Sequence, residues 1–386
     1  MKWETVEIGL LGEVITGNTP PRKNPELYGN FFPFIKPTDI EIDRRFTPNP
    51  EECYSELGYE RYRKSLIPKG ATCVVTIGSI GKKITQAISD CFINQAVNAV
   101  IPNDNYDDDF VFYLLKNNLN KVKGLDSGTS SGRENVSKSS FSSIEVKVVK
   151  HLPTQRKIAS ILSAYDGLIE NNLKRIKLLE EKAQLHYNQC NPIELKTLQN
   201  LADYLGRGVT PKYEDGSGFF AINQKANKGS LLDYSQFKSL DTKLKVPDEK
   251  LAKWGDLLIN SLGEGTLGRV HFYTDKSDLF AVDQHMSIFR TQQLHHTFYL
   301  YQFLGSAYGQ GLLDSLKKGG TNMTMLNIKD LRQLNVTFPR ENEILYLWGI
   351  CKPLFQLKQN LINQNTKLRE ARDILLPKLM NGQIEV

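Results

Sequence analysis

The sequence lacks the features that mark membrane proteins, secreted proteins and disulfide-rich domains. Its 386 residues include no run of about 18 apolar residues, so a membrane-spanning helix is not expected. Residues 1–9 are charged and lack the apolar core of a signal peptide. The five cysteines form no Cys-x-x-Cys pair, and their number is odd. We therefore expect a cytoplasmic protein with reduced thiols and no membrane partner.

Familiar catalytic motifs are also missing. The chain has no P-loop, and the run Asn-Thr-Pro-Pro at 18–21 has the wrong order for an adenine methyltransferase tetrapeptide. Residues 247–250 (Pro-Asp-Glu-Lys) resemble a nuclease motif only in compressed form and favour a turn. The glycines of 263–268 match a β-turn at 78–81 in the repeat described below, rather than a phosphate-binding loop. His295 and His296 are adjacent on an expected helix and should point in different directions. We expect no catalytic residue, no metal and no cofactor in this chain.

Length and charge set broad limits on the fold and its partners. A chain of 386 residues is too long for one compact core and indicates two domains with connectors. The net charge of +6 favours a polyanionic partner, although many basic proteins bind none.

A set of motifs occurs twice, in the same order and at a nearly constant offset, which indicates an internal repeat. A Gly-x-Thr-Pro motif followed by a basic residue stands at 17–23 and again at 208–212. The other matching pairs of segments are 31–36 with 218–223, 67–82 with 252–269, 93–96 with 282–285, and 141–146 with 331–336.

Within each repeat, short apolar runs bounded by Gly, Pro, Asn and Asp predict strands. These runs are 73–77, 97–101, 144–149, 280–282, 286–290 and 334–338. Short helices are expected at 109–118 and 296–305. Each repeat is therefore interpreted as an α+β globular domain.

A long segment with helical periodicity follows each repeat. In the second segment five leucines are spaced seven residues apart, as in a coiled coil. We expect the two helices to pair antiparallel, although each could instead pack on its own domain. The expected interface residues are Ile158, Ile161, Tyr165, Leu168, Ile176, Leu179, Leu347, Ile350, Leu354, Leu357, Leu361, Leu368 and Leu375.

The expected architecture is α+β and pseudo-two-fold symmetric, with two similar globular domains separated by two long helices in an antiparallel coiled coil. The expected boundaries are 1–150 for the first domain, 151–191 for the central helix, 192–340 for the second domain and 341–386 for the C-terminal helix. Such helices would act as a ruler between two stretches of duplex DNA, read by domains of different sequence.

The helical segments resemble the specificity (S) subunits of Type I restriction-modification systems. The resemblance is carried by PTQRKIASIL at 153–162, LIENN at 168–172 and LREARDILLPKLMNG at 368–382, and the length and repeat order agree. It implies two target recognition domains, each reading one half of a bipartite, non-palindromic DNA site. It further implies that the helices set the spacer and dock two modification subunits, which carry S-adenosylmethionine and methylate adenine at N6. Restriction subunits would add ATP-dependent cleavage, and the S subunit itself would be non-catalytic.

Polar and basic loops at matching places in the repeats are the candidate DNA contacts. The two loops at 127–138 and 317–324 are interpreted in this way, with a flexible linker as the alternative. The candidate residues are Arg22, Lys23, Lys36, Lys82, Lys83, Arg133, Asn135, Lys138, Lys212, Asn223, Lys225, Arg269, Lys317, Lys318, Thr321 and Asn322. Gln95 and Gln284 fit base reading and loop bracing equally well.

Two other functions remain open from the sequence. One is a coiled-coil scaffold with two peptide-binding heads and no role on DNA, and the other is an enzyme with an unrecognised site in one head. A steep fall of binding with salt would favour DNA over peptide.

Overall fold

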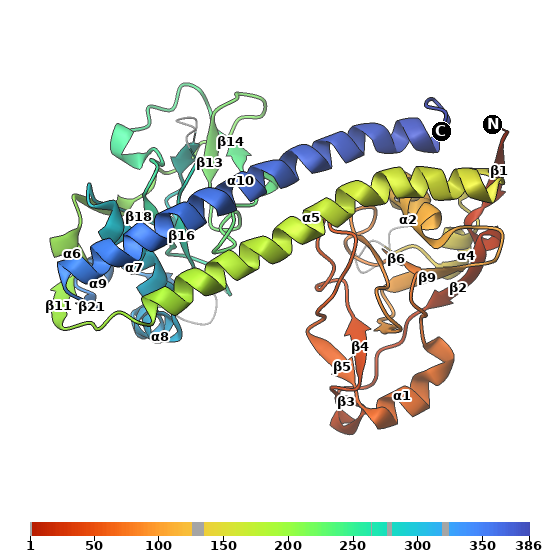
Figure 1. Cartoon of the computed structure of the whole chain (residues 1–386), viewed down its shortest axis with the longest axis horizontal. Helices are drawn as coiled ribbons and strands as arrows, with labels where there is room; N and C mark the ends of the chain where they lie inside the picture. The colour runs from red at the N-terminus through yellow and green to blue at the C-terminus, as the bar shows by residue number, and fades with distance from the viewer. Residues whose placement is uncertain (1, 126–134, 264, 276–279, 319–323) are drawn as a thin grey trace. The chain divides into compact units, whose positions relative to one another are not determined.

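The chain forms two compact units in a computed structural model, which describes residues 2–125, 135–263, 265–275, 280–318 and 324–386. Unit 1 consists of residues 1–174 and 362–386, and unit 2 of residues 175–361 (Figure 1). Each unit therefore combines one copy of the repeat with part of each long helix. Within the described part of the chain, none of the helices combines the length and the apolar character needed to cross a membrane.

Unit 1 is built on an antiparallel four-stranded sheet in the order β2-β9-β6-β7. A second sheet, β3-β5-β4-β8, contains one parallel pair, β4 with β8, and β1 pairs with β10. The strands are β1 Trp3–Glu7, β2 Gly12–Thr16, β3 Tyr28–Gly29, β4 Phe32–Ile35, β5 Glu52–Tyr54, β6 Thr72–Val75, β7 Ile84–Gln86, β8 Phe92–Ile93, β9 Val97–Pro102 and β10 Glu145–Val149. The short helices are η1 Ile8–Leu10, η2 Pro25–Leu27, α1 Glu56–Tyr62, η3 Arg63–Ser65, α2 Asp108–Asn117, α3 Leu119–Gly124 and α4 Lys138–Ser142.

Unit 2 repeats this topology. Its antiparallel sheet has the order β12-β18-β15-β16, the parallel pair is β13 with β17, and β11 pairs with β21. The strands are β11 Glu194–Thr197, β12 Tyr204–Arg207, β13 Phe220–Ile222, β14 Lys238–Ser239, β15 Leu257–Asn260, β16 Val270–Phe272, β17 Phe280–Val282, β18 Met286–Arg290, β19 Lys317–Lys318, β20 Met325–Leu326 and β21 Asn335–Phe338. The short helices are α6 Leu198–Leu201, η4 Tyr234–Gln236, η5 Asp248–Lys250, α7 Leu294–Gly305, α8 Ala307–Ser315 and α9 Ile328–Arg332.

The internal repeat and the α+β class expected from the sequence are thus confirmed. The expected strands and the two expected short helices lie within a few residues of their observed bounds; α2, for example, begins at Asp108 and α7 at Leu294. The central sheet shares an apolar core with α2 in unit 1 and with α7 in unit 2. Consecutive residues of each of these two helices are buried, so neither helix is apolar on one face alone.

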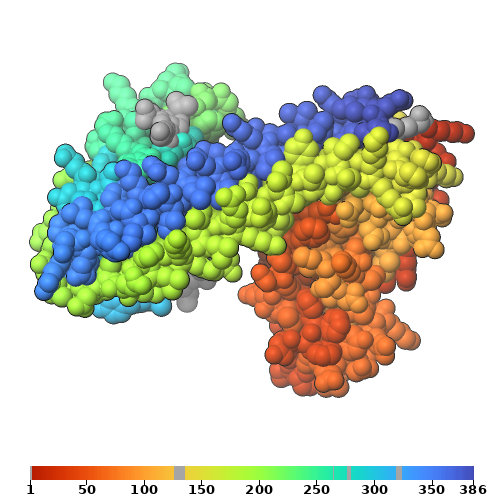
Figure 2. All heavy atoms as spheres, in the orientation of Figure 1, coloured from red at the N-terminus to blue at the C-terminus, as the bar shows by residue number. Residues whose placement is uncertain are grey.

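The long helices are α5 (Leu152–Tyr187) and α10 (Glu341–Met380). In unit 1 the first part of α5 packs against the last part of α10, with Asp166 bonded to Arg372 (Figures 1 and 2). In unit 2 the last part of α5 packs against the first part of α10, where Glu180 pairs with Lys358. The pairing is therefore antiparallel in both units.

The helices also pack on the domains, so the alternative arrangement expected from the sequence is partly right. Ile158 and Leu376 belong to the apolar core of unit 1, and Leu347 and Phe355 belong to that of unit 2. Each long helix thus packs against both the other helix and the domain of the same unit.

The heptad assignment needs correction at two positions. Leu168 is 54% exposed and Leu357 is 39% exposed, whereas the adjacent Ile169 and Lys358 are buried. An α-helix has 3.6 residues per turn, so its buried face drifts away from a strict seven-residue repeat. Of the other expected interface residues, Ile158, Ile176, Leu347 and Leu361 are buried, and those that remain are half-buried, namely Ile161, Tyr165, Leu179, Ile350, Leu354, Leu368 and Leu375.

In both units, the position of the glycine in the repeated Gly-x-Thr-Pro motif has no room for a side chain. A Cβ atom on Gly17 would lie 2.1 Å from the carbonyl oxygen of Ile93, and one on Gly208 would lie 2.1 Å from that of Val282. These carbonyls belong to the repeated segments 93–96 and 282–285, so two of the repeated motifs contact each other in each unit.

Alanine at either glycine is expected to destabilise its own unit. Gly17→Ala and Gly208→Ala should each lower the free energy of unfolding by about 1–3 kcal/mol, because main chain must move to admit the methyl group. Urea denaturation measures this. The matched controls are Gly167→Ala in unit 1 and Gly311→Ala in unit 2, where a Cβ atom meets nothing within 4 Å. Equal stability of the Gly17→Ala and Gly167→Ala chains would contradict the steric explanation.

Candidate nucleic-acid interface

Two of the expected DNA contacts in unit 1 are engaged by acidic side chains. Arg22 Nη2 donates to Glu52 Oε1 at 2.9 Å, and its guanidinium carbon lies 4.7 Å from the centre of the Tyr28 ring. Lys36 Nζ lies 2.8 Å from Glu51 Oε2 and 3.1 Å from Glu52 Oε1. The hydrogen bond from Arg22 is the main cause that lowers the pKa of Glu52. These side chains form a local ion-pair network next to the exposed Lys23.

Of the next two candidate lysines, Lys83 is engaged within the domain and Lys82 is not buried. Lys83 is half-buried, and its Nζ donates to the Pro37 carbonyl at 2.6 Å; burial lowers its pKa. Lys83 is therefore better suited to bracing the domain than to a phosphate. Lys82 is exposed.

Only residues 135–138 of the polar loop at 127–138 are among the described residues. Arg133 lies outside the described residues. Asn135 is half-buried and forms a β-bridge with Ile77, and Lys138 is the exposed first residue of α4.

In unit 2 one lysine of the first candidate loop is also paired with an acidic residue of the same unit. Lys212 Nζ lies 2.9 Å from Asp241 Oδ2, and this contact is the main cause that raises the pKa of Lys212. Asn223 is buried: its Nδ2 donates to the Gln236 carbonyl at 2.6 Å, and its Oδ1 accepts from the amide of Lys225 at 2.9 Å. Asn223 therefore shapes the turn and leaves Lys225 exposed; contact of either residue with DNA stays a prediction.

The remaining candidates in unit 2 lie around β16 and β19. Arg269 Nη1 donates to the Asn227 carbonyl at 2.8 Å. Lys317 pairs with Asp314, and Lys318 Nζ lies 2.6 Å from Asp330 Oδ2. Both lysines remain exposed. Thr321 and Asn322 lie outside the described residues.

The matched glutamines Gln95 and Gln284 brace loops. Thr210 Oγ1 donates to Gln284 Oε1 at 2.8 Å, and Thr19 donates in the same way to Gln95. Each threonine belongs to the Gly-x-Thr-Pro motif of its unit. Of the two interpretations left open by the sequence, the hydrogen bonds favour loop bracing.

A basic cleft in unit 1 combines Lys138, an expected DNA contact, with three cationic residues that the sequence analysis missed. It encloses about 830 Å³ beside β2, and Arg61, Arg63, Lys64 and Lys138 line it together with Asn18. All four cationic residues are exposed. Two acidic residues, Glu13 and Glu60, line the same cleft. Four basic residues against two acidic ones give a cationic surface that is accessible to an anionic backbone.

The corresponding segment of unit 2 also carries exposed basic residues but has no net charge. Arg61, Arg63 and Lys64 lie between β5 and β6, and the segment between the equivalent strands β14 and β15 carries Lys243 and Lys245, both exposed. Residues 240–256 contain four lysines and four acidic residues, whereas residues 55–71 contain four basic residues and two acidic ones. The two segments thus share their topological place and exposed cationic side chains, but not their net charge.

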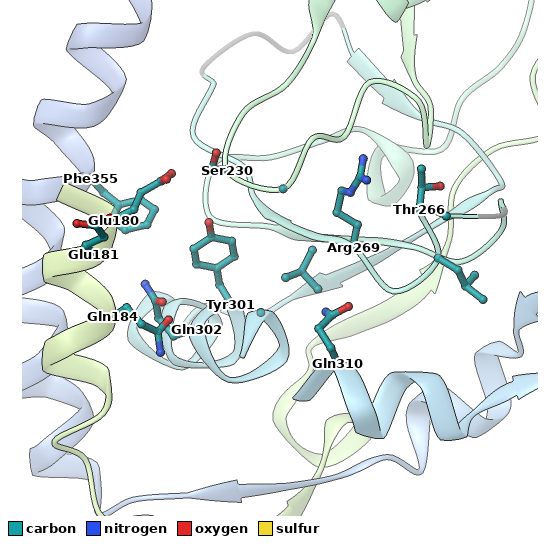
Figure 3. Close-up of a pocket in the computed structure, with 15 residues that line it drawn as sticks. Glu180, Glu181, Gln184, Ser230, Thr266, Arg269, Tyr301, Gln302, Gln310 and Phe355 are labelled. Carbon is teal, nitrogen blue, oxygen red and sulfur yellow. The ribbon is translucent and has the colours of Figure 1, made fainter. Parts of the chain in front are cut away.

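A different pocket in unit 2 is unsuited to phosphate. Figure 3 shows Glu180, Glu181 and Gln184 of α5 on one side of it, and Arg269 and Thr266 on the other. Its volume is about 590 Å³. Arg269 is the one basic residue in a lining that includes two carboxylates, so the pocket is not cationic.

The two adjacent histidines correct an expectation. His295 Nε2 and His296 Nε2 lie 2.6 and 2.8 Å from the two carboxylate oxygens of Glu341, and the ring centres are 4.6 Å apart. The side chains therefore converge, contrary to the sequence argument, because one carboxylate offers an oxygen to each ring. The potential ligand atoms of all three residues lie within 4.8 Å of one another. The cluster joins the start of α7 to the start of α10.

Known proteins that resemble this chain agree on one class. Residues 1–181 match the family model described as "Type I restriction modification DNA specificity domain". The MjaIX specificity subunit of a Type I restriction enzyme from Methanocaldococcus jannaschii is 24% identical over all of this chain and 94% of its own length. The HindI specificity subunit from Haemophilus influenzae is 30% identical over 46% of this chain and 39% of its own length.

The fold also matches a solved structure. The crystal structure of a Type I restriction-modification S subunit from M. genitalium superposes with a TM-score of 0.54 at 16% identity, covering 98% of this chain and 96% of that one. At this identity the match concerns the fold alone.

Proposed function

The chain belongs with the Type I restriction-modification specificity subunits, and on this premise we propose that each of its two units reads one half of a bipartite, non-palindromic DNA site. Specificity subunits are the non-catalytic component of these complexes. The two units share a topology but differ in the residues of their loops, so the half-sites that they read should differ in sequence.

The observation that carries this proposal is the basic cleft of unit 1, together with exposed lysines at the same topological place in unit 2. Arg61, Arg63 and Lys64 in unit 1 and Lys243 and Lys245 in unit 2 lie between equivalent strands and are exposed. Lysine and arginine on phosphates fix the position of a protein on the duplex, and neighbouring polar side chains then reach base edges.

The long helices are proposed to set the spacer between the half-sites and to dock two modification subunits. S-adenosylmethionine, and ATP where restriction subunits join the complex, are expected on those partners and not on this chain. The antiparallel packing of α5 and α10 supports this role, because paired helices resist bending better than a single one.

Exchange of one recognition domain tests the proposal. The full chain is produced with its modification subunits, and methylated adenines in the host DNA are mapped. Replacing residues 1–150 by the corresponding domain of another specificity subunit should change one half-site and leave the other half-site unchanged. Binding of the specific duplex should also fall about tenfold or more between about 50 and 200 mM salt. A complex that modifies no defined bipartite sequence would overturn the proposal, and binding insensitive to salt would favour the peptide-binding scaffold.

A further inference from the structure

The cluster of His295, His296 and Glu341 in unit 2 has the composition of a metal site. It offers two imidazole nitrogens and one carboxylate, and the potential ligand atoms lie within 4.8 Å of one another. Imidazole and carboxylate groups hold Zn²⁺ in sites with three protein ligands, where water or another small ligand fills the remaining position. Among the described residues, this is the one group of three or more such side chains that lie close enough to share an ion.

The separations of the donor atoms are close to those that a bound ion requires. His295 Nε2 lies 2.6 Å from Glu341 Oε1, and His296 Nε2 lies 2.8 Å from Glu341 Oε2. Bonds of about 2.0–2.1 Å at tetrahedral angles place two ligand atoms about 3.3 Å apart. Each contact would therefore open by only about half an ångström to admit the ion. Small side-chain rotations can supply this change, because the side chain of Glu341 is 52% exposed.

The two imidazole rings are held in place by their surroundings. The side chain of His296 is 10% exposed, and its ring meets that of Phe338 edge-on, with the ring centres 5.3 Å apart. The side chain of His295 is 16% exposed. Both histidines lie in the first turn of α7, and Glu341 is the first residue of α10. Because the ligands stand on packed helices, little further ordering is needed to bind an ion.

The charges around the cluster oppose one another. The first amides of α7 and α10 carry partial positive charge, which disfavours a cation. Lys196 adds a positive charge near His296, but its Nζ lies 3.0 Å from Glu194 Oε2. The carboxylate of Glu341 offsets the remaining positive charge. An ion with a high affinity for imidazole suits this site better than Mg²⁺ or Ca²⁺, which require several oxygen ligands.

We propose that His295, His296 and Glu341 bind one divalent transition-metal ion of the zinc class, with water at its remaining position. The ion joins the start of α7 to the start of α10, which lies 45 residues further along the chain. Coordination requires the lone pair of each histidine Nε2, so the proton that this nitrogen donates to Glu341 leaves it when the ion binds. The expectation from the sequence that the chain holds no metal depended on diverging histidine side chains, and the two rings converge.

Zinc titration of the full chain tests the proposal. Metal is first removed with a chelator, and the affinity for Zn²⁺ is then measured by competition with a chromophoric chelator. The unaltered chain should bind one ion, and Glu341→Gln and His295→Gln should each weaken binding by about tenfold or more, because each removes a ligand. Glutamine at position 341 can still accept a hydrogen bond, so this variant should keep its fold, which circular dichroism checks. Co²⁺ used as a probe should give visible absorption bands without the near-ultraviolet band of a cysteine ligand.

His285→Gln is the matched control, because it removes another histidine of unit 2 that contacts a carboxylate. His285 Nδ1 lies 2.8 Å from Asp283 Oδ1, and no third ligand joins this pair among the described residues. The control should keep the zinc affinity of the unaltered chain. At free zinc about 100 times the dissociation constant, the midpoint of thermal unfolding should rise by about 5 °C or more in these two chains, and much less in Glu341→Gln. Failure of the unaltered chain to bind micromolar Zn²⁺, or equal affinities in the unaltered and altered chains, would overturn the proposal.

Discussion

Replacement of Arg372 by methionine is expected to destabilise unit 1 by about 3–5 kcal/mol, because it leaves Asp166 buried without its cation. Arg372 is fully buried, and Asp166 has a 3% exposed side chain. Tyr113 Oη also donates to Asp166, at 2.5 Å, but a neutral hydroxyl does not replace a guanidinium. Urea denaturation followed by circular dichroism should show the unit 1 transition at a lower denaturant concentration.

Two controls separate the removal of a buried charge pair from a general defect. The Asp166→Asn/Arg372→Met chain removes both charges and should recover most of the stability, because no buried ion is left unpaired. Lys177→Gln breaks an exposed pair of 3.8 Å with Glu181, and should change stability by less than about 1 kcal/mol. If Arg372→Met lowered the stability no more than Lys177→Gln does, the buried pair of Asp166 and Arg372 would not stabilise the contact between α5 and α10.

The second large effect is expected in DNA binding. The triple replacement Arg61→Gln, Arg63→Gln and Lys64→Gln should weaken binding about a hundredfold or more at about 0.1 M salt, and should reduce the slope of log affinity against log salt by about 0.9 for each phosphate that is no longer neutralised. These side chains are exposed and line the basic cleft of unit 1. The measurement is a fluorescence anisotropy titration of the complex with its duplex at several salt concentrations.

A charge-matched control addresses the overall charge of the chain. Lys69, Lys147 and Lys150 are exposed residues of unit 1 that do not line the cleft. Their joint replacement by glutamine removes the same total charge and should alter affinity much less. Because phosphate contacts carry no sequence information, the cleft variant should keep the preferred half-site. An equal fall in affinity in the two triple variants would show that the cleft has no special part in binding.

The fold could be derived largely from the order of short local patterns. The expected strands, the two short helices and the two long helices all occur, because each depends on local apolar periodicity and many are bounded by Gly, Pro, Asn or Asp. The repeat could be seen in advance because Gly17 and Gly208 have the same steric surroundings, which admit no side chain. A requirement of this kind preserves a motif in both copies.

The candidate site was less accessible to sequence reasoning, because exposure and pairing are tertiary properties. Lys36, Lys212 and Lys318 look like phosphate ligands in the sequence, yet each has an acidic partner from another segment of the chain. Asn223 proved to be a turn residue. Of the cations that line the basic cleft, Lys138 was expected from the sequence. Arg61, Arg63 and Lys64 lie outside the matched motifs, so comparing the repeats did not identify them.

By itself, the sequence determined that the chain contains one α+β domain twice, each followed by a long helix, because periodicity and turn residues act locally. Only the tertiary structure decided which cations remain exposed and which face of each helix is buried. Leu168 and Leu357 fit the heptad and yet lie outside, while Asp166, Lys358 and Arg372 lie inside. A charged residue can be buried only where its partner meets it, and for Asp166 that partner is 206 residues away along the chain.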